Sequence, residues 1–119
     1  MKNQLITTTA AVLVLGCASR MQPPVISIHK AAKTGNIKAV KQHLTAGVDV
    51  NAMDANKMTA LHWAAMKGQK KVVGLLIAKG ANLNAKTSKN LTPLNLADNN
   101  FQNEIAELLI ANGASEFVY

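Results

Sequence analysis

The feature that most constrains this chain is an internal repeat of 33 residues, which superposes three stretches of the sequence without a gap. Its clearest columns hold apolar residues, alanines or glycines at equivalent positions. These columns are Ile28, Leu61 and Leu94; Ala31, Ala64 and Ala97; Leu44, Ile77 and Ile110; and Gly47, Gly80 and Gly113. Units this short cannot each enclose a core, so they must bury their apolar faces against one another in a stack.

Each unit has the pattern of two short helices followed by an extended loop. In the middle unit, Thr59 is suited to cap the first helix and Gly68 to end it. The apolar residues of 70–79 recur at helical spacing and predict the second helix. In the third unit, Thr92 is again a cap, and Pro93 falls on the first helical position, where proline is tolerated. The sequence therefore predicts an all-α solenoid of three helix-turn-helix units with β-hairpin-like connecting loops.

These motifs resemble the ankyrin repeat, whose pattern carries Thr-Pro-Leu-His-x-Ala-Ala, then Gly, Val-x-x-Leu-Leu and Gly-Ala-Asp-Val-Asn-Ala. The middle unit matches best, through Thr59, Leu61, His62, Ala64, Ala65, Gly68, Val72, Val73, Leu76, Gly80, Ala81 and Asn84. The resemblance covers about residues 25–116 and implies a repeat domain with units at 25–57, 58–90 and 91–116.

Departures from the ankyrin pattern fall mainly at the two ends of the predicted stack. They are Ile26 and Lys30 in the first unit and Asn95, Asp98 and Phe101 in the third. We interpret them as end units that meet water with one face. One departure is internal: Lys57 occupies a hairpin tip that is usually glycine, where a left-handed conformation would cost it about 1 kcal/mol. Its counterpart Asn90 is better suited to that conformation.

The N-terminal segment has the layout of a secretory signal, with Lys2 before an apolar stretch from Leu5 to Leu15. As a helix this stretch rises about 17 Å, well short of the roughly 30 Å hydrocarbon core of a bilayer. The residues Leu13-Val14-Leu15-Gly16-Cys17 that end it resemble the lipobox of bacterial lipoproteins, in which the cysteine thiol carries diacylglycerol. We therefore expect a signal peptide at 1–16, a lipid-anchored tether at 17–24, and lipidation of Cys17.

An ordinary secretory signal cleaved after Ala18 is the alternative, and both interpretations place the mature chain outside the cytoplasm. With lipid on Cys17, we expect attachment on the periplasmic side of a membrane. We expect sorting to the outer membrane rather than the inner one. The resemblance to lipoproteins implies this, because those retained at the inner membrane commonly have Asp after the lipidated cysteine, where this chain has Ala18. Without lipid, the chain would be soluble in the periplasm or secreted. As the only cysteine, Cys17 also excludes an intramolecular disulfide and a cysteine zinc cluster.

Catalytic chemistry is not indicated by the sequence. His29 and His62 share one repeat position, which raises a two-histidine metal site, but no third ligand recurs with them. The resemblance instead implies that these histidines tie one unit's loop to the next by hydrogen bonds. We expect His43 to be a surface or packing residue and Trp63 to fill space between units. No nucleophile constellation or glycine-rich phosphate loop is present, so we expect no enzyme, cofactor, metal or small-molecule substrate.

Charge is distributed unevenly along the chain. Residues 28–90 hold eleven lysines against Asp49 and Asp54, a net charge of +9, whereas residues 91–119 hold four acidic and no basic residues, a net charge of −4. A basic surface of this kind attracts acidic partners or anionic lipid headgroups. Nucleic acid is disfavoured as a partner by the predicted export and by an aromatic content of 3%.

The resemblance implies a non-catalytic module that binds an unidentified protein through a concave surface of hairpin tips and inner helices. By repeat position, the contact residues would be Lys33, Thr34, Ala55, Asn56, Met58, Met66, Lys67, Lys86, Ser88, Lys89, Leu91, Asn99 and Asn100. Among them, Met58, Met66 and Leu91 are candidate apolar anchors. The alternative function is an envelope-attached structural or protective lipoprotein whose lysine-rich face contacts anionic lipid or cell-wall polymer.

Overall fold

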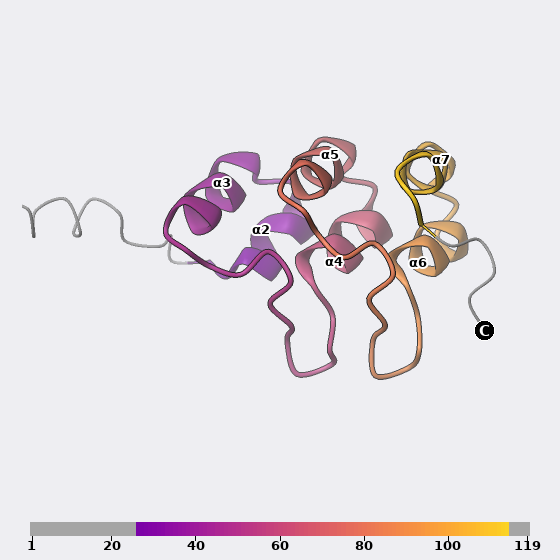
Figure 1. The fold of residues 1–119 in the computed structure, drawn as a ribbon, viewed down its shortest axis with the longest axis horizontal. Coiled ribbons are helices and arrows are strands. Elements are labelled where there is room, and N and C mark those ends of the chain that lie inside the picture. The colour runs from indigo at the N-terminus through magenta and orange to yellow at the C-terminus, as the bar shows by residue number, and fades with distance from the viewer. Residues whose placement is uncertain (1–25, 115–119) are drawn as a thin grey trace, which may run out of the picture.

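A computed structural model describes residues 26–114, so the predicted signal peptide and Cys17 lie outside the described residues. Within 26–114 the chain forms helices and no strands. The helices come as three pairs: α2 (Ile28–Thr34) with α3 (Ile37–Thr45), α4 (Ala60–Lys67) with α5 (Lys70–Ala78), and α6 (Pro93–Asn99) with α7 (Asn103–Ala111). The pairs stand side by side in chain order (Figure 1). The all-α stack of helix pairs is confirmed.

The helix ends follow the capping residues of the sequence. The Thr59 side chain accepts a hydrogen bond from the backbone N–H of His62 at the start of α4. Thr92 does the same for Asn95 at the start of α6, where Pro93 takes the first helical position. Gly68 ends α4 with a left-handed φ of 77°. These local signals set the helix bounds because each satisfies backbone groups that a helix terminus leaves unpaired.

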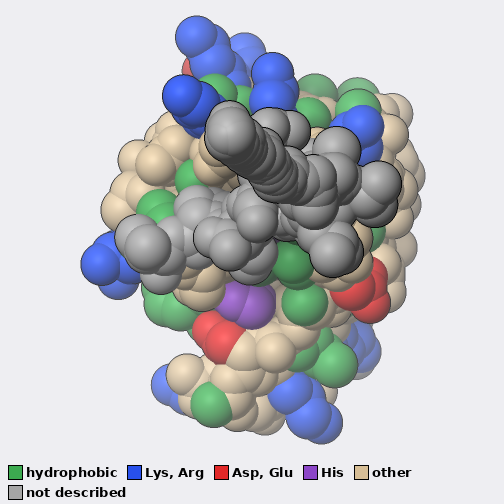
Figure 2. All heavy atoms as spheres, turned by 90° about the vertical axis from the view of Figure 1, so that its left-hand side faces the viewer, with side chains coloured by type: hydrophobic (Ala, Val, Ile, Leu, Met, Phe, Trp, Pro, Cys, Tyr) green, Lys and Arg blue, Asp and Glu red, His purple; other side chains and the backbone are tan. Residues whose placement is uncertain are grey.

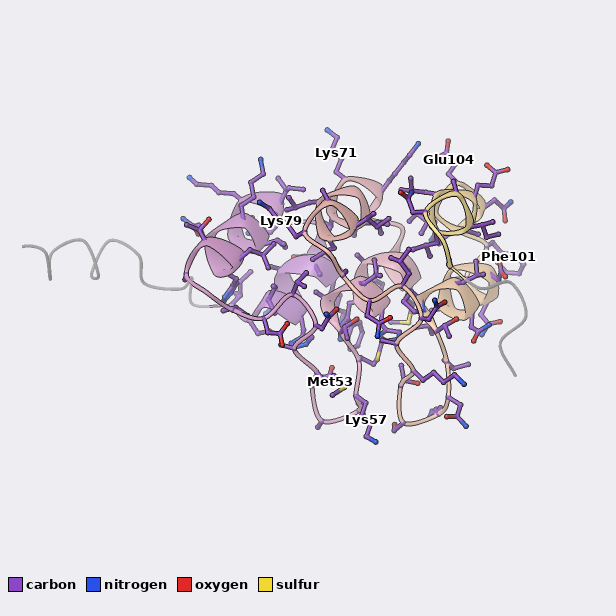
Figure 3. All side chains as sticks on the ribbon, viewed as in Figure 1. Met53, Lys57, Lys71, Lys79, Phe101 and Glu104 are labelled. Carbon is purple, nitrogen blue, oxygen red and sulfur yellow. The ribbon has the colours of Figure 1, made fainter. Side chains whose placement is uncertain are left out.

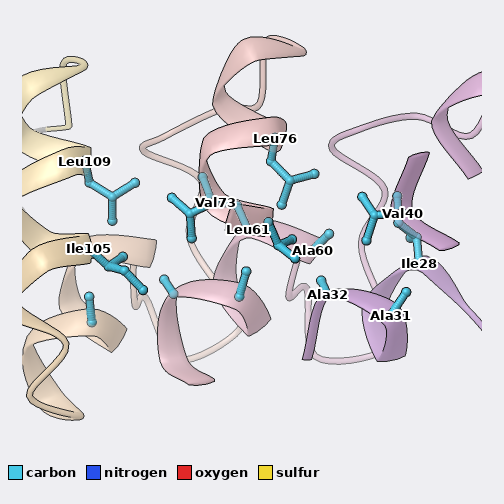
Figure 4. Close-up of a cluster of buried hydrophobic side chains, with 14 of the residues drawn as sticks. Ile28, Ala31, Ala32, Val40, Ala60, Leu61, Val73, Leu76, Ile105 and Leu109 are labelled. Carbon is cyan, nitrogen blue, oxygen red and sulfur yellow. The ribbon is translucent and has the colours of Figure 1, made fainter. Parts of the chain in front are cut away.

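The inner helices α2, α4 and α6 form one row, and the outer helices α3, α5 and α7 form a second row above it in the view of Figure 1. Contacts between neighbouring inner helices are much more extensive than those between neighbouring outer helices. The difference follows from side-chain size. The inner row meets through fully buried alanines, namely Ala31, Ala32, Ala60, Ala64, Ala65 and Ala97. The outer helices cover them with larger residues, including Val40, Val73, Leu76 and Leu109 (Figure 4).

A glutamine of each following unit lies against the glycine that ends the inner helix of the unit before it. The Gln69 amide donates to the backbone carbonyl of Lys33 at 3.1 Å, which pairs a terminal carbonyl of α2. A Cβ at Gly35 would collide with this Gln69 side chain, and a Cβ at Gly68 would collide with Gln102. The third copy of this position is Phe101, which keeps the left-handed φ of 60° although its side chain is 86% exposed.

Two loops, at residues 51–59 and 84–92, project side by side from the row of inner helices (Figure 1). Each closes as a tight hairpin, through Asp54 N–H to the Met58 carbonyl and Thr87 N–H to the Leu91 carbonyl, both 2.9 Å. The predicted left-handed residue at each tip is confirmed, with φ of 59° for Lys57 and 62° for Asn90. The Lys57 side chain points away from the stack (Figure 3).

Candidate functional site

Two cavities open between adjacent units on the side of the inner helices and hairpin loops. The first cavity, about 590 Å³, is lined by Ser27, His29, Lys30, Lys33, Thr34, Asp54 and Trp63. The second cavity, about 250 Å³, is lined by Asn56, Met58, Met66, Thr87, Ser88, Lys89, Leu91 and Leu96. The two are copies of one inter-unit site, because three lining pairs are 33 residues apart: Lys33 and Met66, Asp54 and Thr87, Trp63 and Leu96.

The first cavity is charged and aromatic. The Trp63 indole N–H donates to Asp54 Oδ2 at 3.0 Å, and the Lys33 ammonium lies 5.2 Å from the centre of the Trp63 ring. Lys30, on the exposed side of α2, makes no ion pair with any residue of 26–114. This cavity therefore offers a tryptophan ring together with two ammonium groups, a combination suited to a carboxylate beside a flat or aliphatic group.

Asp54 brings one negative charge against the two lysines, which leaves the cavity a net charge of +1, and its carboxylate is hydrogen-bonded within its own loop and to Trp63. Its Oδ1 accepts hydrogen bonds from the backbone N–H groups of Asn56 at 2.8 Å and Met58 at 3.0 Å. Burial alone would raise the pKa of Asp54, but the hydrogen bonds from Met58, Trp63 and Asn56 outweigh it and hold the pKa below 3.8. Asp54 thus stays ionised and shapes the hairpin.

The second cavity is apolar where the first is charged. Met58, Met66, Leu91 and Leu96 form its wall, and Ser88 and Lys89 lie at its exposed rim. Thr87 Oγ1 accepts from the backbone N–H groups of Lys89 and Leu91 at 3.2 Å each, so it replaces Asp54 without bringing a charge. Flexible methionine side chains adapt to a range of aliphatic or aromatic partners.

The histidines at the shared repeat position hold the hairpin loops against the inner helices. His62, which is fully buried, donates through Nε2 to the carbonyls of Ala85 at 2.9 Å and Leu91 at 3.1 Å. Its Nδ1 accepts the Thr59 N–H at 2.9 Å, which assigns the proton to Nε2. Burial lowers the His62 pKa, and the bonds to the two carbonyls only partly oppose this.

His29 repeats the arrangement, with Nε2 2.9 Å from the Ala52 carbonyl. Both histidines bond the loop of their own unit, and only His62 also reaches the next unit, through the Leu91 carbonyl, so the expectation that they tie one unit's loop to the next is confirmed for His62 alone. Among residues 26–114, no three His, Cys, Asp or Glu side chains gather as they would to hold a metal ion. His43 is a packing residue, 6% exposed, whose Nε2 lies 2.7 Å from the Ile26 carbonyl and whose Nδ1 has no partner within this part of the chain. It takes the place of Leu76 and Leu109 in the other units.

Eight of the residues predicted to make contacts line the two cavities: Lys33 and Thr34 the first, and Asn56, Met58, Met66, Ser88, Lys89 and Leu91 the second. The other predicted residues are exposed outside the cavities: Ala55, Lys67, Lys86, Asn99 and Asn100. Sequence reasoning missed Ser27, His29, Lys30, Asp54, Trp63, Thr87 and Leu96 as lining residues. The repeat register could have paired Asp54 with Thr87 and Trp63 with Leu96.

Trp63 was expected to fill space between units, and this holds for only part of its side chain. It is half-buried: it packs against the core while also lining the first cavity. The physical reason is its partner across the unit boundary. The equivalent residue of the first unit is the exposed Lys30, which leaves the Trp63 ring open to the cavity and to Lys33.

Helix pairs stacked at a 33-residue period, with hairpin loops beside the inner row, define a solenoid repeat protein. The family model described as Ankyrin repeats (3 copies) matches residues 28–117, and the chain belongs to the ankyrin-repeat family. A search of the curated proteins finds no match. Ankyrin repeats are generally protein-interaction modules and typically non-catalytic. None of the helices in 26–114 is long and apolar enough to span a membrane.

Proposed function

We propose that this chain is a non-catalytic interaction module of a bacterial envelope, which binds an extended segment of a partner protein across its inner helices and hairpin loops. The observation that carries the proposal is the pair of equivalent cavities with different chemistry. One offers Lys30 and Lys33 beside Trp63, and the other offers an apolar wall around Met66. A segment that fits both has an acidic side chain for the first cavity and an apolar side chain for the second.

Crosslinking in intact cells tests this function. A photoactivatable residue at Met66 or Ser88 is expected to yield one discrete adduct, since both positions line the second cavity. The same residue at Lys38 or Lys71, on the outer helices, is the matched control and should not yield that adduct. Adding Lys30→Glu and Lys33→Glu to the Met66 protein should weaken the adduct by repelling the acidic part of the partner.

An adduct that appears equally from Lys71, or one that is indifferent to the charge reversal, would contradict binding across both cavities. The folded state of each variant is checked by circular dichroism, because Lys33 also contacts Trp63. Trp63 is the only tryptophan of the chain, so its fluorescence reports directly on occupation of the first cavity once a partner segment is in hand.

The proposal includes export and a lipid anchor on Cys17, supported by the lipobox-like run that ends at this residue. Cys17→Ser should abolish palmitate labelling and release the protein from the membrane fraction. Ala18→Asp should keep the label but shift the protein from the outer to the inner membrane. Labelling that persists in the serine variant would refute lipidation and leave cleavage after Ala18 as the alternative.

A further inference from the structure

The outer helices carry a positive charge that the fold itself does not require. Within α3 and α5 there are four lysines and no acidic residue, and Lys79 follows at the end of α5. These five are Lys38, Lys41, Lys70, Lys71 and Lys79. In the end-on view lysine side chains lie along the outer-helix edge and also at the opposite, hairpin-loop edge (Figure 2), and Figure 3 shows Lys71 and Lys79 among the outer helices. Only Lys70 among them forms an ion pair within residues 26–114, with Glu104 at 3.9 Å.

Three of these lysines stand where the helix disfavours them. Lys38 follows directly on the first residue of α3, and Lys70 and Lys71 begin α5. The amino end of a helix carries a partial positive charge, so cations there are destabilising. The repeat does not require a lysine at the position of Lys41 either, because that position holds Gly74 in the second unit and Glu107 in the third. Lys79, at the carboxyl end of α5, is favoured there by the helix, whereas the presence of the other four lysines is better explained by something outside the fold.

A groove runs between α3 and α5, because the outer helices pack less closely than the inner ones. It has a volume of about 280 Å³ and is lined by Lys41, Leu44, Thr45, Leu75 and Lys79. Both lysines are exposed, while both leucines are half-buried. Lysines flanking apolar side chains match the boundary of an anionic bilayer, where ammonium groups meet phosphates and short apolar surfaces meet the first methylenes.

We infer that the outer faces of α3 and α5 form a contact surface for an anionic lipid bilayer. An RNA or DNA partner is disfavoured because no phenylalanine, tyrosine, tryptophan or arginine lies on these helices, and the His43 ring of α3 is buried. The surface lies opposite the hairpin loops (Figure 1), so a chain lying on a membrane through it keeps both cavities free for a protein. This inference does not depend on the proposed function of the cavities.

Vesicle binding tests the surface with the full chain carrying Cys17→Ser, so that no lipid on the protein contributes. The protein should bind vesicles containing phosphatidylglycerol and not pure phosphatidylcholine vesicles. Binding should be lost in 1 M salt, where charges are screened beyond about 3 Å. Lys41→Gln with Lys79→Gln should lower the partition coefficient about fivefold per lysine, the equivalent of about 1 kcal/mol each.

The matched control is Lys86→Gln with Lys89→Gln, which removes the same charge from the second hairpin loop and should change binding less than the groove variant does. A polarity-sensitive dye attached through Ala78→Cys on α5 should respond to vesicles, whereas the dye attached through Ala55→Cys on the first hairpin should not. Equal loss in both double variants, or no preference for anionic vesicles, would overturn the inference. Binding to polyglutamate without binding to vesicles would instead assign the surface to an acidic protein.

Discussion

Lys57 holds a backbone conformation that suits glycine, with a φ of 59° at the first hairpin tip. A residue with a side chain costs about 1–2 kcal/mol in that conformation, and replacing it with glycine removes this cost. Part of the gain is offset because glycine loses more conformational entropy on folding. We expect Lys57→Gly to raise the free energy of unfolding by about 0.5–1 kcal/mol, measured by urea denaturation. Lys57→Ala keeps the Cβ atom and is the control, so a similar gain from alanine would point to the lost charge instead.

His62 gives the stability a pH dependence. Its pKa is lowered in the folded chain, so the unfolded chain binds a proton first as the pH falls. The stabilising contribution of neutral His62 is therefore complete above about pH 6.5 and declines as the pH falls from there through the folded pKa. Denaturation curves at neutral and mildly acidic pH should show this decline.

His62→Asn is the matched variant, because Asn95 occupies the same position in the third unit and caps α6 through its own side-chain oxygen. The variant should lose overall stability, since the asparagine cannot also reach the Ala85 carbonyl as the imidazole does. It should nevertheless be less sensitive to pH between 7 and 5 than the natural chain. An unchanged pH profile would assign the dependence to other groups.

For individual residues, the sequence predicted the features that recur from one repeat to another but not the side-chain contacts that occur only once. The left-handed tips at Lys57 and Asn90 and the hydrogen-bonding histidines follow from comparing residues 33 positions apart. The Trp63–Asp54 bond and the Lys33–Trp63 contact have no such counterpart. They depend on a loop and two inner helices meeting in space, and their side chains give no periodic signal.

At the level of helices, Gly74 inside α5 is a position where alanine should stabilise the fold. Apart from its chain neighbours and the nearby backbone of its own helix, a Cβ at this position would meet no atom within 4 Å, and glycine inside a helix costs about 0.5–1 kcal/mol relative to alanine. Gly74→Ala should therefore raise the melting temperature by several degrees, at about 4–8 °C per kcal/mol for a domain of this size. Calorimetry measures the shift.

Gly68→Ala is the opposite case and serves as the control. It combines a φ of 77° with a collision against the Gln102 side chain, so the same chemical change should lower the melting temperature. A lower melting temperature for Gly74→Ala would mean that the outer face of α5 is not free.

Helix positions were predictable because caps and turn glycines act locally, whereas the groove between α3 and α5 was not, since it depends on how far apart the packed helices lie.

At the level of the whole molecule, stability resides in the interfaces between units. Ala64 is fully buried where α4 packs among the inner helices, and a larger side chain there must push helices apart. Ala64→Leu should destabilise the fold by about 1–3 kcal/mol, and Trp63 fluorescence and circular dichroism should report one shared transition. Ala78→Leu, at an exposed position on α5, is the control and should have little effect. Transitions that separate would show units melting independently.

The order of the stack was predictable from the repeat, because a 33-residue period leaves each unit only its neighbours to pack against. Its two chemically distinct cavities were not, because equivalent positions share a backbone but hold different side chains. Lys33 and Met66 are one position in the repeat and yet give one cavity its charge and the other its apolar wall.

Phe101 determines where this scaffold can be lengthened. In the first two units the equivalent glycine makes room for the glutamine of the unit that follows. An engineer who inserts further copies of the middle unit between existing ones would preserve that arrangement at each new junction. A copy grafted onto the outer side of the third unit would bring its glutamine against the phenyl ring, so extension there requires Phe101→Gly first.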